Sequence, residues 1–193
     1  VLIESSGKTA ALETIKYLEV KQSAIFQATF ITDKFLARAD VLEYDSETDS
    51  WNLYEIKGTN SLKEKTDDRD HIDDAAFQYI TLGDCGLKIG TINIIHLNKD
   101  YIRGDEINVQ ELFAIDDITD KILEQEEATR EKMSEAAQAL FQKDERAVNC
   151  NCIYKGRSNH CSTFSYAHPE VPEYAIHDLY RIGLRKKKLA SLV

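Results

Sequence analysis

Apolar and polar positions along the first third of the chain predict one helix followed by three strands. In residues 8–20, KTAALETIKYLEV, the apolar residues Leu12, Ile15 and Val20 recur at helical spacing. The next apolar runs alternate with polar positions and are rich in β-forming residues, which is typical of strands. These predicted strands are residues 24–31, 35–45 and 51–57. The polar segment SETDS between the last two predicts a hairpin, so side chains of these strands should meet across the pair.

The pattern then changes to a helical period, returns to a strand and ends in a long helix. The segment DRDHIDDAAFQYITLGDCG places its apolar residues on one stripe of a helix. These residues are Ile72, Ala75, Ala76, Tyr79, Ile80 and Leu82. Residues 91–98, TINIIHLN, are nearly all apolar, as in a strand covered on both faces. A charged helix follows, capped by Asp116 or Thr119 and ending near Phe141. This order predicts an α/β fold with a mixed central β-sheet flanked by helices.

Length and composition are those of an ordinary globular protein with one main domain. The chain has 193 residues, of which 42% are hydrophobic and 30% charged, and only two are proline. Its apolar runs are shorter than the roughly 18 residues of a membrane span, and the N-terminus lacks a signal-peptide pattern. We therefore expect a cytoplasmic protein with no membrane partner. Because the first residue is Val1 and not methionine, we also expect the chain to be a piece of a longer protein.

The negative charge is concentrated in the main body of the chain. Residues 1–142 hold 15 Lys and Arg against 29 Asp and Glu, a net charge of −14, whereas residues 143–193 hold 9 against 5, a net charge of +4. This distribution argues against a body coated in positive charge for nonspecific nucleic-acid binding. It predicts a core over residues 1–142 and a basic, cysteine-containing C-terminal extension over residues 143–193. The run RIGLRKKKLA in that extension fits either contact with a phosphate backbone or a solvated tail helix.

Two charged residues interrupt the apolar row of the third predicted strand. Since side chains alternate along a strand, Leu53, Glu55 and Lys57 share one face. On the neighbouring strand, Asp40 shares a face with Leu42. Burying such charges costs several kcal/mol per ion unless they are paired or bind a metal. One explanation is an ordinary salt bridge at the end of the sheet. The other is a site in which Asp40 and Glu55 hold Mg²⁺ or Mn²⁺ and Lys57 stabilises the charge that develops during phosphodiester hydrolysis.

The order Asp40, then Glu55-Ile56-Lys57 at a strand end after a hairpin, resembles the PD-(D/E)xK nuclease motif. The helical segment DDAAFQYITL resembles the helix that carries an additional glutamine in RecB-like nucleases, including the CRISPR-associated exonuclease-like branch. The resemblance implies a restriction-endonuclease-like core in which Asp40, Glu55 and the Ile56 carbonyl bind the metal. It also implies that Lys57 is the catalytic lysine and that Gln78 contacts the hydrated metal or DNA.

Some positions depart from the family pattern. Ala39 stands where the motif has proline, and Leu82 holds the place four residues after Gln78 that is usually tyrosine. Tyr79 lies beside Gln78 instead and is a candidate for DNA contact. Asp74, one helical turn before Gln78, could position that glutamine or act only locally. Basic residues near the expected site are further candidates for DNA contact: Lys63, Lys65 and Arg69.

Three cysteines cluster after the long helix: Cys150, Cys152 and Cys161. The resemblance to RecB-like nucleases implies that they hold a [4Fe–4S] cluster in the full-length protein, with a fourth cysteine upstream of the first residue. Zinc is the alternative, because His160 or His168 could complete a Cys₃His site. Three unliganded thiols are the remaining reading. The fourth cysteine, Cys85, is expected to be a packed small residue.

The leading hypothesis is thus a metal-dependent deoxyribonuclease, an exonuclease acting in recombination, repair or defence with a helicase or another repair or defence protein as partner. A second hypothesis is a nucleic-acid-binding or scaffolding module that keeps the nuclease fold without cleaving. A third is an interaction domain stabilised by zinc.

Overall fold

The computed structural model describes residues 1–62, 71–141 and 159–178. The chain divides into two compact units, Val1–Phe141 and Gln142–Val193. The two units are described separately below.

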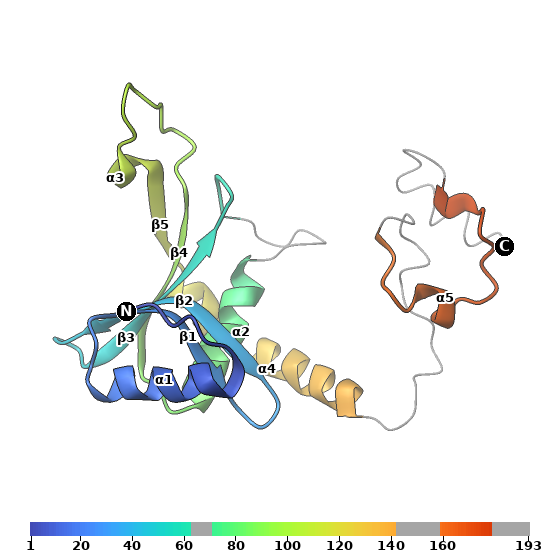
Figure 1. Cartoon of the computed structure of the whole chain (residues 1–193), viewed down its shortest axis with the longest axis horizontal. Coiled ribbons are helices and arrows are strands. Elements are labelled where there is room, and N and C mark those ends of the chain that lie inside the picture. The colour runs from blue at the N-terminus through green and yellow to red at the C-terminus, as the bar shows by residue number, and fades with distance from the viewer. Residues whose placement is uncertain (63–70, 142–158, 179–193) are drawn as a thin grey trace. The chain divides into compact units, whose positions relative to one another are not determined.

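The first unit is built around one mixed β-sheet with helices packed against it. Its elements, in chain order, are α1 (Gly7–Glu19), β1 (Ala24–Ile31), β2 (Leu36–Asp45), β3 (Ser50–Lys57), α2 (His71–Asp84), β4 (Ile89–Leu97), α3 (Val109–Leu112), β5 (Phe113–Asp117) and α4 (Thr119–Phe141). The strand order is β1-β2-β3-β4-β5, and only the β3–β4 pair is parallel. Because parallel neighbours need a crossover, α2 carries the chain from β3 to β4 (Figure 1). The predicted α/β fold with a mixed sheet flanked by helices is confirmed.

The end of the sheet differs from the prediction. A short helix, α3, and a fifth strand, β5, precede the long helix, and neither was predicted. Asp116 is therefore inside β5 and is not the helix cap, whereas the helix begins at Thr119, whose N–H donates to Asp117 Oδ1 at 2.9 Å. The strand escapes prediction because it has five residues, none of them fully buried, so its alternation carries little apolar contrast.

Helix α1 is confirmed, but it buries a different face from the one its apolar residues indicated. The apolar residues that predicted it are largely exposed: Leu12, Ile15 and Val20. Its buried side chains are Ala10 and Thr14, which are small enough to let the helix lie close to β1. Thr14 Oγ1 also accepts a hydrogen bond from Thr29 N–H of β1 at 2.9 Å. The buried face therefore combines small residues, the partly buried Tyr17 and Leu18, and one specific polar contact with the sheet.

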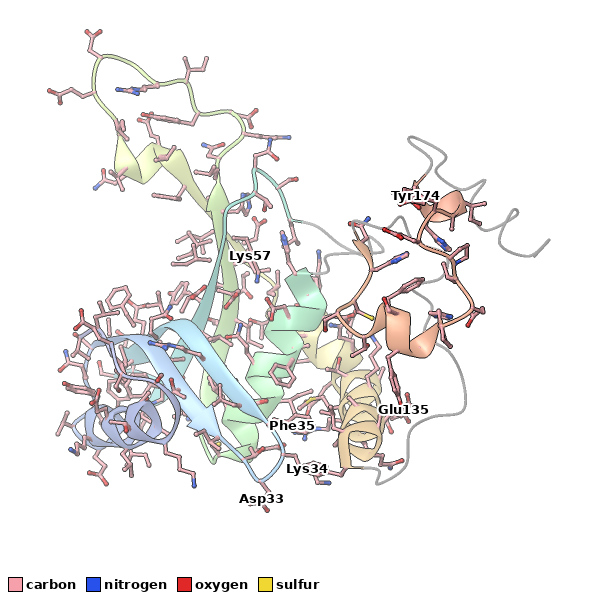
Figure 2. All side chains as sticks on the ribbon, turned by 45° about the vertical axis from the view of Figure 1, so that its right-hand side comes forward. Asp33, Lys34, Phe35, Lys57, Glu135 and Tyr174 are labelled. Carbon is pink, nitrogen blue, oxygen red and sulfur yellow. The ribbon has the colours of Figure 1, made fainter. Side chains whose placement is uncertain are left out.

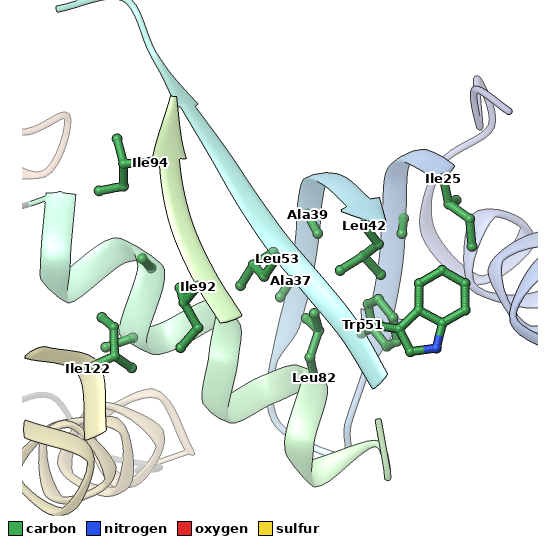
Figure 3. Close-up of a cluster of buried hydrophobic side chains, with 14 of the residues drawn as sticks. Ile25, Ala37, Ala39, Leu42, Trp51, Leu53, Leu82, Ile92, Ile94 and Ile122 are labelled. Carbon is green, nitrogen blue, oxygen red and sulfur yellow. The ribbon is translucent and has the colours of Figure 1, made fainter. Parts of the chain in front are cut away.

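The hydrophobic core gathers side chains from all of β1 to β4 and from the helices α1, α2 and α4 (Figure 3). The fully buried large residues in it include Ile25, Leu42, Leu53, Leu82, Ile92 and Ile94. Each such side chain stabilises the fold by about 1.5–3 kcal/mol relative to its exposed state. The single tryptophan of the chain, Trp51, is buried in the same core on β3. The core thus holds the central strands, whose ends carry the charged residues, in a fixed register.

The described residues of the second unit pack around one aromatic side chain. This part contains α5 (Phe164–Ala167) and the 3₁₀ helix η3 (Ile176–Asp178). The Phe164 ring stacks on His160 with a centroid distance of 3.5 Å and lies 4.9 Å from His168. In the described parts of both units, no helix is long and apolar enough to cross a membrane.

Candidate active site

Strand β2 is irregular at Asp40. The pairing of β2 with β1 includes Ala39 and Val41 but omits Asp40, and the pairing with β3 starts only at Val41. Burial along the strand passes from Ala37 and Ala39 to Leu42, so the regular alternation expected here does not hold through Asp40. Neither the β1–β2 ladder nor the β2–β3 ladder therefore includes a residue pair at this aspartate. We call this gap in the pairing the opening in β2.

The Asp40 carboxylate occupies the opening by accepting a hydrogen bond from each neighbouring strand. Oδ2 accepts from the Ile56 main-chain N–H at 2.8 Å, and Oδ1 accepts from Gln27 Nε2 at 2.9 Å. In an extended strand the N–H and C=O of one residue point to the same side. The Ile56 carbonyl is therefore on the Asp40 side of β3, as the predicted metal site requires.

Glu55 is a nearly buried carboxylate, 7% exposed, in the middle of the candidate site. Its Oε1 accepts from Lys57 Nζ at 2.7 Å, and its Oε2 accepts from Gln78 Nε2 at 2.6 Å. Burial raises the pKa of Glu55, the nearby Asp40 carboxylate raises it further, and the bonds from Lys57 and Gln78 oppose this only in part. An opposing cation would relieve the repulsion between the two carboxylates.

Lys57 lies at the end of β3, beside the start of α2 (Figure 2). Its ammonium group forms ion pairs with Glu55 and with Asp74 of α2. Burial by itself lowers the pKa of Lys57, but the hydrogen bonds with Asp74 and Glu55 outweigh that effect and raise it. Among the described residues, the Asp74 carboxylate holds Lys57 in place, a role that differs from the two considered for it.

Gln78 joins α2 to the carboxylate pair. Its side chain is 6% exposed and donates to Glu55, while its Oε1 is buried and has no hydrogen-bond partner among the described residues. Leaving such an acceptor unpaired costs about 1–3 kcal/mol, so the atom is suited to a bound water or cation ligand. Tyr79, the neighbouring candidate, is partly buried against the core, and burial, followed by the charge of Glu126 of α4, raises the pKa of its hydroxyl.

A histidine–aspartate pair that sequence reasoning missed lies on β4 and β5, the two strands that follow β3 in the sheet. In the parallel β3–β4 register Lys57 is opposite His96, and His96 Nε2 lies 2.9 Å from Asp116 Oδ2 of β5. His96 Nδ1 lies 2.9 Å from the Leu97 carbonyl oxygen. Both partners are acceptors, which favours the protonated ring, and these bonds with Leu97 and then Asp116 raise the pKa of the buried His96. His96 was hidden in an apolar run, and Asp116 had been interpreted as a helix cap.

The donor set fits a small hard cation. Asp40, Glu55 and the Ile56 carbonyl supply oxygen atoms, and Mg²⁺ characteristically takes only one or two protein carboxylates and keeps several waters. The unpaired Gln78 Oε1 could accept from one of those waters. Within the described ranges, no group of three or more His, Cys, Asp or Glu side chains could hold a metal by itself. Two carboxylates and one carbonyl as oxygen donors suit a hydrated ion.

Several predicted site residues lie outside the described residues: Lys63, Lys65, Arg69, Cys150, Cys152 and the run at 181–190. Cys161 is exposed in the second unit, where His160 stacks on Phe164 and His168 Nδ1 lies 3.3 Å from Glu170. The expectation of a packed Cys85 is wrong. This residue follows the end of α2 and is exposed, with its Sγ 3.7 Å from the Ile31 carbonyl oxygen.

No protein-family model matches the sequence, and no curated protein matches it. The chemistry of the site therefore has to be inferred from its own residues.

Proposed function

We propose that the Val1–Phe141 unit is a restriction-endonuclease-like, PD-(D/E)xK nuclease core that hydrolyses phosphodiester bonds of DNA with Mg²⁺ or Mn²⁺. The observation that carries the proposal is the meeting of Asp40, Glu55 and Lys57 with Gln78 at one end of the sheet, from β2, β3 and α2. Apolar side chains would be expected at these strand positions. Burying charged side chains there is costly unless they are paired or bind a metal. A RecB-like exonuclease role in recombination, repair or defence is the form of the activity that the sequence resemblance supports.

Two carboxylates and one main-chain carbonyl would supply the protein oxygen atoms that bind the metal. Among the described residues Asp40 accepts from neutral donors only, so its charge remains available to a cation. Glu55 is nearly buried beside Asp40, so a bound cation would offset the burial and the carboxylate repulsion that raise its pKa. The Ile56 carbonyl completes the set of protein oxygens. When bound, Mg²⁺ or Mn²⁺ polarises the phosphate and makes water a stronger nucleophile.

Lys57 is placed to act on the reacting groups. Its raised pKa keeps the amine protonated at neutral pH, so it donates hydrogen bonds and is not a general base. If Glu55 bound a cation, the ion pair with Asp74 would still hold the ammonium group at the site. Lys57 then orients the attacking water and stabilises the negative charge that develops on the phosphate oxygens. Gln78, through its open acceptor oxygen, orients a water of the hydrated ion.

Cleavage assays on single- and double-stranded DNA with Mn²⁺ or Mg²⁺ test the proposal. We expect Asp40→Asn and Glu55→Gln to reduce cleavage to background while DNA binding remains. Lys57→Met should lower the cleavage rate by about 100- to 1,000-fold, as for loss of one charge-stabilising donor. Glu43→Gln is the matched control, because Glu43 is an exposed acid on the same strand as Asp40 and bonds only to the Tyr54 hydroxyl among the described residues.

Wild-type protein that binds DNA but leaves it intact with both metals contradicts the nuclease proposal and supports the noncleaving binding module. Equal cleavage by wild type and Asp40→Asn would point to a contaminating nuclease. Both measurements should use the full-length protein, so that any cofactor of the extension is present.

Metal analysis of anaerobically purified full-length protein addresses the cysteine-containing extension separately. Iron and acid-labile sulfide would support a [4Fe–4S] cluster held by Cys150, Cys152 and Cys161 with an upstream cysteine. Zinc would support a Cys₃His site completed by His160 or His168, and neither metal would indicate unliganded thiols.

A further inference from the structure

One residue inside a strand has a backbone conformation that its type rarely adopts. Three described non-glycine residues have positive φ: Lys21 (49°), Gln27 (61°) and Asp49 (49°). Lys21 and Asp49 lie in turns, but Gln27 lies within β1. The left-handed conformation is energetically unfavourable for glutamine. Residues with such unfavourable backbone conformations cluster at active sites and ligand-binding sites. The position of Gln27 therefore calls for a functional explanation.

Gln27 stands opposite the opening in β2. The β1–β2 pairs on either side are Phe26 with Val41 and Ala28 with Ala39, so Gln27 faces the position that both ladders omit. The distorted backbone is braced from the side of α1, because Thr29 Oγ1 donates to the Gln27 carbonyl at 3.4 Å. Thr29 N–H in turn donates to the buried Thr14 hydroxyl of α1. The conformation is thus supported by neighbours that take no part in the candidate chemistry.

The side chain of Gln27 uses this conformation to reach the Asp40 carboxylate. Gln27 Nε2 donates to Oδ1 at 2.9 Å, while the Ile56 N–H donates to Oδ2. With one hydrogen bond on each oxygen, rotation of the carboxylate is restricted, and each oxygen keeps a second lone pair for a ligand. Both donors are neutral. They orient the carboxylate without cancelling the charge that a cation needs, which a lysine or arginine at position 27 would do.

We propose that Gln27 is a positioning residue that orients Asp40 and thereby sets the affinity of the site for a divalent cation. The inference rests on the proposed function, because it takes Asp40 to be a metal ligand. Loss of the outer hydrogen bond to a metal ligand typically lowers metal affinity by about 10- to 100-fold. The strained conformation of β1 is the structural cost of placing the amide at Asp40.

Two substitutions separate the amide from the backbone. Gln27→Met keeps the chain length and the strained φ but removes the donor, whereas Gln27→Gly removes the donor and relieves the strain. Mn²⁺ affinity of the full chain is measured by calorimetric titration, and binding that survives in Asp40→Asn is subtracted as unrelated to the site. Asp49→Gly is the matched control, since it relieves a positive φ in a turn away from Asp40.

We expect both Gln27 variants to bind Mn²⁺ about 10- to 100-fold more weakly than wild type. The melting temperature of Gln27→Gly should be equal to or higher than that of Gln27→Met. Asp49→Gly should bind Mn²⁺ like wild type. Wild-type affinity in Gln27→Met overturns the inference but leaves the nuclease proposal standing. Wild-type protein that binds no more Mn²⁺ than Asp40→Asn overturns both.

Discussion

Replacing Lys57 by methionine tests whether the charged cluster is held together as the structure indicates. Methionine preserves most of the apolar stem and removes the ammonium group. Glu55 then stays nearly buried beside Asp40 without the Lys57 ammonium group, and Asp74 of α2 loses its ion pair with Lys57. The cost should appear in the metal-free protein as a lower free energy of unfolding.

The size of that cost follows from the contact and its exposure. Lys57 Nζ and Glu55 Oε1 are 2.7 Å apart, and the two side chains are only 18% and 10% exposed. Hydrogen bonds to charged groups contribute about 1.5–3 kcal/mol, and removing one partner of a fully buried ion pair costs about 3–5 kcal/mol. Because this pair keeps some contact with solvent and the Asp74 carboxylate is half exposed, we expect Lys57→Met to cost about 2–3 kcal/mol.

Urea unfolding at about pH 8 with a chelator measures this value, and Trp51 fluorescence reports the core that holds the strands. In the Glu55→Gln background no unpaired carboxylate remains at position 55, so the same lysine substitution should cost less than about 1 kcal/mol. The cost should also fall as the pH is lowered through the raised pKa of Glu55, because protonation removes the unpaired buried charge. A Lys57→Met protein within about 0.5 kcal/mol of wild type, or additive effects in the double variant, would refute the reasoning.

Three further outcomes are expected. The pKa of His96 is raised in the fold, so the stability lost in His96→Gln should be greatest below the ordinary histidine pKa of about 6.5. This loss should vanish as the pH rises through the raised pKa. A difference in urea unfolding that does not change with pH contradicts this. Asp74→Asn should slow cleavage by about two- to fivefold without changing Mn²⁺ affinity, because it weakens only the hold on Lys57, and an altered affinity argues against this role. Leu53→Ala, in the fully buried core, should cost about 2–5 kcal/mol in urea unfolding followed by Trp51 fluorescence, and a loss below about 1 kcal/mol is incompatible with the described packing.

Local periodicity was sufficient to predict most of the first unit. The strands over residues 24–31 and 51–57, and the helix that carries Gln78, follow from apolar spacing because burial of one face leaves its period in the sequence. The face that α1 buries did not follow, since its contact with β1 uses Ala10 and Thr14 while larger apolar residues remain exposed. Helix propensity predicts that a helix forms, but the sheet against which the helix packs decides which face is buried.

The candidate site shows the same division. Asp40, Glu55 and Lys57 could be selected from the sequence because charges interrupt apolar strands in a spacing that resembles a known motif. Gln27 and His96 could not be selected. Gln27 reaches Asp40 only because β1 adopts a positive φ opposite the opening in β2, and His96 is placed opposite Lys57 only by the parallel β3–β4 register. Such contacts join residues distant along the chain, and strand register, which depends on the packing of the whole sheet, decides whether they form.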